Sequence, residues 1–288
     1  MLSTFIQHHY NALLVLITTA LSGATLGMIG VLALMRKQAM LSDALAHATL
    51  PGIACAFILF AVVFPAQAHS APYLWLLIGA TWSSLCAIGL MTWLNHHHEL
   101  STDAAIATII SVFFPLGVVL LSYIQTLPIA GQAGLDRFLL GSVATMTLDE
   151  ALTTSLLAIA LSVLLLVWKK ELFAFCFDED FCHAHHIDRG WGQTMILTLI
   201  LLATVIGLQT IGLILLIALL ITPAASAWLV TRSFRQLLIV SMLLGSSACL
   251  VGGSLSYLYP HWPSGALIVL ILTSQFFLAL LYHRYKTT

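Results

Sequence analysis

The feature that most constrains this chain is a series of long apolar runs that extends from one end to the other. Each run is near the ~20 residues that a helix needs to cross the hydrocarbon core of a bilayer. Nine runs stand out, at 12–34, 44–64, 73–94, 104–124, 152–168, 191–208, 209–230, 237–259 and 264–282. Backbone polar groups in a bilayer must be satisfied internally, so such runs predict helices. We therefore predict an all-α integral membrane protein with about nine transmembrane helices, in a range of eight to ten.

One division between these runs is left open by the sequence. Residues 191–230 are almost unbroken in their apolar character and contain Gly207 and Gly212. The segment fits either two spans or one span with a re-entrant segment. Small residues elsewhere, at Gly23, Gly27 and Gly245–Gly253, stand at positions suited to close contact between helices.

The charge content agrees with a membrane setting. Only 7% of the 288 residues are charged and 60% are hydrophobic, whereas about a quarter are charged in an ordinary soluble domain. A soluble protein needs a charged surface that these residues cannot supply, whereas lipid solvates apolar surface. The net charge is −1 and the sequence has no basic runs, so it lacks the positive patch that nucleic-acid-binding proteins use. Membrane lipid is therefore an expected partner, and nucleic acid is not.

The positive charges predict an orientation. If the N-terminus is outside and the spans alternate, nine of the ten Lys and Arg residues fall on the cytoplasmic side and only Arg137 falls outside. The nine are Arg36, Lys37, Lys169, Lys170, Arg189, Arg232, Arg235, Arg284 and Lys286. Cytoplasmic loops carry an excess of Lys and Arg. We therefore predict that the N-terminus is outside and the C-terminus is cytoplasmic.

Asp43 and His47 are the sharpest candidates for chemistry. They lie four residues apart in LSDALAHATLPG at 41–52, so a helix projects them from one face. A carboxylate oxygen with a neutral imidazole nitrogen suits Zn²⁺, Mn²⁺ or Fe²⁺, whereas an all-oxygen set favours Ca²⁺ or Mg²⁺. An ionisable pair at the head of an apolar span indicates a functional site. The alternative is that Ser42 or Asp43 caps the helix and His47 hydrogen-bonds a neighbouring helix.

A cytoplasmic connection at 169–190, KKELFAFCFDEDFCHAHHIDRG, combines aromatic residues with clustered charge. Exposed phenylalanines at 173, 175, 177 and 181 would be unfavourable in water, which favours a docking surface. Alternatively, these rings lie at the membrane interface.

Several segments, taken in order, resemble the ABC-3 family of metal-importer permeases. The signature is MRKQAMLSDALAHATLPGIACAF, and further similar segments follow at 101–122, 134–150, 170–181, 208–230 and 263–270. The pattern GLDRFLLG at 134–141 leans toward the manganese-type branch. In that family the signature Asp and His, here Asp43 and His47, lie on the metal path. Phe177, Asp178 and Phe181 resemble the part that docks on the ATPase.

The resemblance implies a homodimeric permease of one domain over 1–288, similar in fold to the cobalamin-type importers. It also implies two cytoplasmic ABC ATPase subunits, an extracytoplasmic metal-binding protein and a place in the bacterial inner membrane. The cargo would be Mn²⁺, Zn²⁺ or Fe²⁺, and no cofactor would be permanently bound. This chain departs from its relatives at Cys182, His183, His185 and His186, which puts the details of the docking segment in doubt.

Two other function classes, an enzyme and a secondary transporter, compete with the permease. The chain has no Walker A, HExxH or GxSxG pattern, so we expect a non-catalytic subunit with ATP hydrolysis in a separate partner. A proton-coupled secondary metal transporter could use the same Asp43–His47 pair, but such proteins usually show two related halves, and no repeat is evident. The clusters His96–His98 and Cys182–His186 fit either solvated loops or a place where metal leaves the pathway; neither has an ordered zinc-site spacing.

Overall fold

The computed structural model describes residues 2–64, 73–97, 101–126, 146–177, 189–259 and 262–287. The described part is helical. Its helices are α1 Leu2–Met35, α2 Ala39–Val63, α3 Tyr73–His97, α4 Thr102–Thr126, α6 Leu148–Val167, α7 Lys169–Phe177, α9 Arg189–Ile211, α10 Leu213–Val230, α11 Phe234–Leu258 and α12 Ser264–Thr287. All except the short α7 are long and apolar enough to cross a membrane, which makes nine candidate spans among the described residues. This confirms the predicted all-α class and number of spans.

The open division within 191–230 falls at a single glycine. Gly212 separates α9 from α10 and has a φ of 85°. This left-handed conformation strains residues that carry a Cβ, whereas glycine adopts it readily. Both flanking helices have the length and apolarity of a span. The structure therefore supports two spans here rather than one span with a re-entrant segment.

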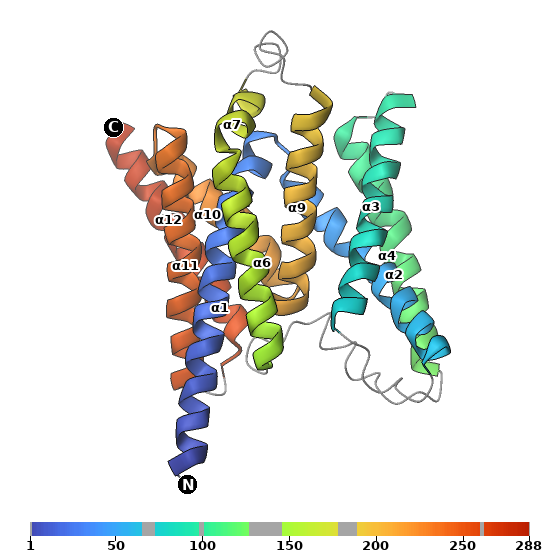
Figure 1. The fold of residues 1–288 in the computed structure, drawn as a ribbon. Coiled ribbons are helices and arrows are strands. Elements are labelled where there is room, and N and C mark those ends of the chain that lie inside the picture. The colour runs from blue at the N-terminus through green and yellow to red at the C-terminus, as the bar shows by residue number, and fades with distance from the viewer. Residues whose placement is uncertain are drawn as a thin grey trace.

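The helices form two groups that meet around α9. Figure 1 shows α2, α3 and α4 on one side, α1, α10, α11 and α12 on the other, and α6 and α9 between them. α1 packs mainly on α11, α10 and α6, whereas α2 packs mainly on α3 and α4. α9 contacts helices of both groups, including α1, α2, α3 and α6. A continuous buried core of aliphatic residues therefore runs through helices from both halves of the chain.

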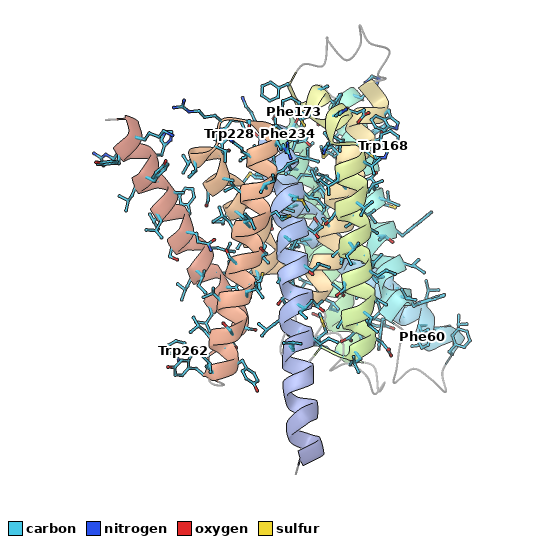
Figure 2. The ribbon with its side chains drawn as sticks, turned by 60° about the vertical axis from the view of Figure 1, so that its left-hand side comes forward. Phe60, Trp168, Phe173, Trp228, Phe234 and Trp262 are labelled. Atoms are coloured by element: carbon cyan, nitrogen blue, oxygen red, sulfur yellow. The ribbon has the colours of Figure 1, made fainter. Side chains whose placement is uncertain are left out.

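Aromatic side chains mark the two ends of the bundle. Figure 2 shows Trp168, Phe173, Trp228 and Phe234 at one end, and Trp262 at the other. Aromatic residues gather at the two water interfaces of membrane proteins. The N- and C-termini lie at opposite ends of the bundle, with α7 at the C-terminal end (Figure 1). The aromatic positions are thus consistent with helices that run across a bilayer.

The crossing of α1 and α11 depends on small residues. The Ser241 hydroxyl donates to the carbonyl of Gly27 at 2.6 Å. A Cβ on Gly27 would lie 2.7 Å from the carbonyl oxygen of Ser241, and one on Gly23 would lie 2.7 Å from that of Gly245. Both obstacles are backbone atoms that cannot move without shifting a helix. This confirms the close contact predicted from Gly23, Gly27 and Gly245.

We therefore expect Gly27→Val to destabilise the bundle by about 1–3 kcal/mol, the usual cost of overpacking a well-packed site. The measurement is the midpoint of thermal unfolding of the purified protein in detergent. Gly89→Val on α3 is the matched control, because a Cβ at Gly89 meets nothing within 4 Å. Equal midpoints for the two variants would show that α1 and α11 do not need this close approach.

Candidate metal site

Helix α2 carries the predicted pair within its first turns. It begins at Ala39, and its N-cap residue Gln38 makes no side-chain cap hydrogen bond. Asp43 therefore lies inside the helix, and the Ser42 hydroxyl donates to the carbonyl of Ala39 at 3.0 Å. This geometry excludes the alternative in which Ser42 or Asp43 caps the helix.

The two side chains meet on one helical face, as their spacing predicts. Oδ1 of Asp43 lies 3.4 Å from Nε2 of His47. Asp43 is 36% exposed and His47 is 19% exposed, so the pair is neither sealed in the core nor freely solvated. An ion about 2.1 Å from each atom, the usual zinc–ligand distance, would subtend an angle of about 110° between them. The pair could therefore supply two ligands of a tetrahedral site without changing its separation.

The other imidazole nitrogen lies in a different environment. Nδ1 of His47 is buried and has no hydrogen-bond partner among the described residues. The ring of Phe114, from α4, packs against the imidazole in a T-shaped contact with centroids 4.8 Å apart and planes at 69°. Among the described residues, Nε2 is therefore the ring nitrogen that faces the Asp43 carboxylate. The sequence pattern did not identify Phe114 as a site residue. It lies within segment 101–122, which resembles the ABC-3 family, and directly precedes Pro115.

A proline and close helix contacts position this pair. Pro51 lies inside α2, and because proline has no N–H the carbonyl of His47 lacks its usual helical donor. A Cβ on Gly117 of α4 would lie 3.1 Å from Pro51, so α4 approaches α2 closely at this proline. From α3, the Ser83 hydroxyl donates to the carbonyl of Ala48 at 2.6 Å. Both neighbouring helices thus hold α2 directly after His47.

The described ligands are too few to form a complete site alone. Among the residues described, no group of three or more His, Cys, Asp and Glu side chains could share one metal ion. Zinc sites normally need four ligands, and manganese often takes more oxygen donors. If Asp43 and His47 bind a metal ion, they would supply only part of its coordination shell.

An apolar cavity of about 440 Å³ lies farther along α2, between α3 and α4. Its lining is mostly apolar and includes Trp75, Trp82, Phe113 and the exposed thiols of Cys55 and Cys86. Thiols can bind soft metals, but no group of three or more His, Cys, Asp and Glu side chains among the described residues could share one ion here. The cavity therefore does not complete the ligand set of Asp43 and His47.

The predicted docking segment is described as far as Phe177. In α7, Phe177 is 67% exposed and its ring lies 4.7 Å from that of Phe173. The prediction of an exposed ring is wrong for Phe175. That ring is buried against Gly192 of α9, and the Arg36 guanidinium lies 4.6 Å from its centroid. The Phe175 ring thus packs α7 against the bundle, whereas the Phe177 ring is exposed.

The remaining candidates lie largely beyond what the structure describes. Asp178, Phe181 and the cluster Cys182–His186 fall in 178–188, outside the described residues, as does Arg137. His96 is exposed near the end of α3, and His98 is again outside the described part. The roles assigned to these positions stay predictions.

Comparison of the whole sequence with known families identifies the family of this chain. The sequence model of the ABC 3 transport family matches residues 8–283, which is nearly the whole chain. The chain belongs to the ABC 3 transport family. This ABC-3 chain is 34% identical over 259 residues to the zinc transport system membrane protein TroC of Treponema pallidum, covering 90% of this chain and 84% of that protein. It is 33% identical over 273 residues to the manganese transport system membrane protein MntC of Bacillus subtilis. This match covers 95% of this chain and 61% of that protein.

A solved structure also resembles the ABC-3 chain closely. PsaBC from Streptococcus pneumoniae, solved in complex with a Fab, has a chain that superposes with a TM-score of 0.79 at 27% identity. The likeness covers 97% of this chain and 95% of that one. The fold is therefore that of an ABC transporter permease, and the protein is a multi-pass membrane protein.

Proposed function

We propose that this ABC-3 protein is the membrane-spanning permease subunit of an ATP-driven importer that carries Mn²⁺, Zn²⁺ or Fe²⁺ into the cytoplasm. The observation that carries the proposal is the Asp43–His47 pair, whose facing atoms lie 3.4 Å apart at the head of an apolar span. Relatives bear the names of zinc, manganese and iron transport systems, which agrees with this mixed oxygen and nitrogen donor set. The metal is cargo in this proposal, and no resident cofactor is assigned.

The permease would work with three kinds of protein partner. These are a cytoplasmic ABC ATPase, an extracytoplasmic metal-binding protein and a second copy of this chain. The incomplete ligand set supports the second copy, because a symmetric partner would bring its own Asp43 and His47 to the same ion. Residues 1–288 are assigned to one permease domain, a choice supported by the core shared between both halves of the chain.

The orientation in the bacterial inner membrane follows from the basic residues. We place the N-terminus outside and the C-terminus in the cytoplasm, because alternating spans then gather nine of ten Lys and Arg residues inside. α2 then starts at the cytoplasmic end. His47 is the ninth residue of α2, about 12 Å along its axis, so the pair falls in the cytoplasmic half of the span.

The proposed mechanism is alternating access. The binding protein releases an ion into the interface between the two copies, where Asp43 and His47 replace part of its hydration shell. ATP-driven closure of the ATPases, transmitted through 169–190, then opens the inner side. Because each copy contributes only two ligands, separation of the two copies would break the coordination shell and release the ion.

The test is metal uptake by cells that lack the gene and by cells that regain it. We expect deletion to lower the content of at least one of the three metals under limiting supply. Restored uptake should disappear when the ATPase partner carries an inactivated Walker A lysine, and should persist when the proton gradient is collapsed with ATP maintained. The opposite pattern would favour the proton-coupled alternative, which none of the comparisons supports.

A further inference from the structure

The contact between Phe114 and His47 joins two helices at the candidate metal site. The phenyl ring comes from α4 and the imidazole from α2, with 4.8 Å between their centroids. The position of Phe114 is set by its own helix. Three residues farther along α4, Gly117 packs against Leu50 and Pro51, where a Cβ would meet both. Phe114 is thus held over the imidazole by the close packing of α4 on α2 at Leu50 and Pro51.

Within the described part of the chain, Nδ1 of His47 does not make the hydrogen bond that usually orients a metal-binding imidazole. Such a histidine normally donates its second ring N–H to a carboxylate, a carbonyl or a water, which fixes the ring. Nδ1 of His47 has no such partner among the described residues. Rotation about the bond to an imidazole ring is broad unless a neighbour restricts it. The packed Phe114 ring is a described contact that supplies this restriction.

We propose that Phe114 is a positioning residue for metal transport. Its ring holds the His47 imidazole with Nε2 toward Asp43 and keeps Nδ1 away from the ion. The inference rests on the proposed function, because it concerns the same two ligands. It also gives a distinct role to an exposed aromatic residue, since Phe114 is 41% exposed and is not simply part of the core.

Loss of the ring should weaken metal capture more than turnover. Removing the group that orients a ligating histidine typically lowers metal affinity about 10–100-fold. We therefore expect Phe114→Leu to raise the KM for Mn²⁺ by about 10-fold or more. The maximal rate should change little, because the ATPase contacts lie elsewhere. Phe114→Tyr keeps an aromatic ring and should stay close to the wild-type KM.

The experiment measures initial uptake of radiolabelled Mn²⁺ against concentration, using the permease with its own ATPase and binding protein in cells. Phe113→Leu is the matched control, since this neighbouring ring is partly buried and lines the apolar cavity instead. Phe113→Leu should leave the KM for Mn²⁺ unchanged. Co-purification with the ATPase measures the amount of assembled complex for each variant, and the variants are compared at equal amounts of complex and binding protein.

Three results would overturn the positioning role. These are an unchanged KM in Phe114→Leu, an equal rise in Phe114→Leu and Phe113→Leu, or an equal rise in the Leu and Tyr variants of Phe114. Asp43→Asn in the same cells separates this failure from that of the proposed function. If Asp43→Asn abolishes uptake while Phe114→Leu keeps the wild-type KM, only the positioning role is wrong. If Asp43→Asn transports normally, the metal site itself is wrong.

Discussion

Asp43→Asn and His47→Ala are expected to abolish metal uptake at limiting metal while the permease still assembles with its ATPase. Each change removes one of the two proposed ligands, whose facing atoms lie 3.4 Å apart. Loss of a group that merely orients a ligand costs about 10–100-fold in metal affinity, so loss of a ligand should cost at least as much. Both side chains are partly exposed, so neither substitution opens a large cavity in the core.

The uptake measurement needs a control for charge. Asp103 is an exposed acidic residue in the first turn of α4, at the end of the bundle where α2 begins. Asp103→Asn removes the same charge without touching the pair and should transport normally. Co-purification with the ATPase checks assembly of all variants. Wild-type uptake by Asp43→Asn or His47→Ala would remove that residue from the site.

Phe177→Ala is expected to weaken association with the ATPase and to uncouple ATP hydrolysis from transport. The phenyl ring is 67% exposed at the end of α7, where it rests on Phe173. Large aromatic residues that enter a partner's pocket commonly contribute about 2 kcal/mol, or about 30-fold in affinity. Phe177→Asp should have a larger effect, because it would place a charge in the same contact.

The readouts are pull-down of the ATPase and the number of ATP molecules hydrolysed per ion transported. Phe277→Ala is the matched control, because Phe277 is a similarly exposed ring on the membrane-spanning helix α12. It should affect neither readout. Normal association of both Phe177 variants would show that this end of α7 is not the docking surface, and would favour the alternative that its aromatic rings lie at the membrane interface.

The local features of this protein were predictable from the sequence for a simple reason. A helix long enough to cross a bilayer needs only a run of apolar residues, so the nine runs correspond to the nine candidate spans among the described residues. The shared face of Asp43 and His47 is equally local, because residues four apart on a helix are always neighbours. The spacing predicted that the two side chains are neighbours, whereas the 3.4 Å distance between their facing atoms came from the structure.

Features that depend on contacts between distant helices came only from the tertiary structure. No local rule brings Phe114 of α4 onto the His47 ring, because that contact depends on how Gly117 packs against Leu50 and Pro51 of α2. Phe175 and Phe177 look alike in an aromatic segment, yet one ring is buried against α9 and the other is exposed. A sequence pattern reports which faces are apolar, whereas helix packing decides which of those faces are covered.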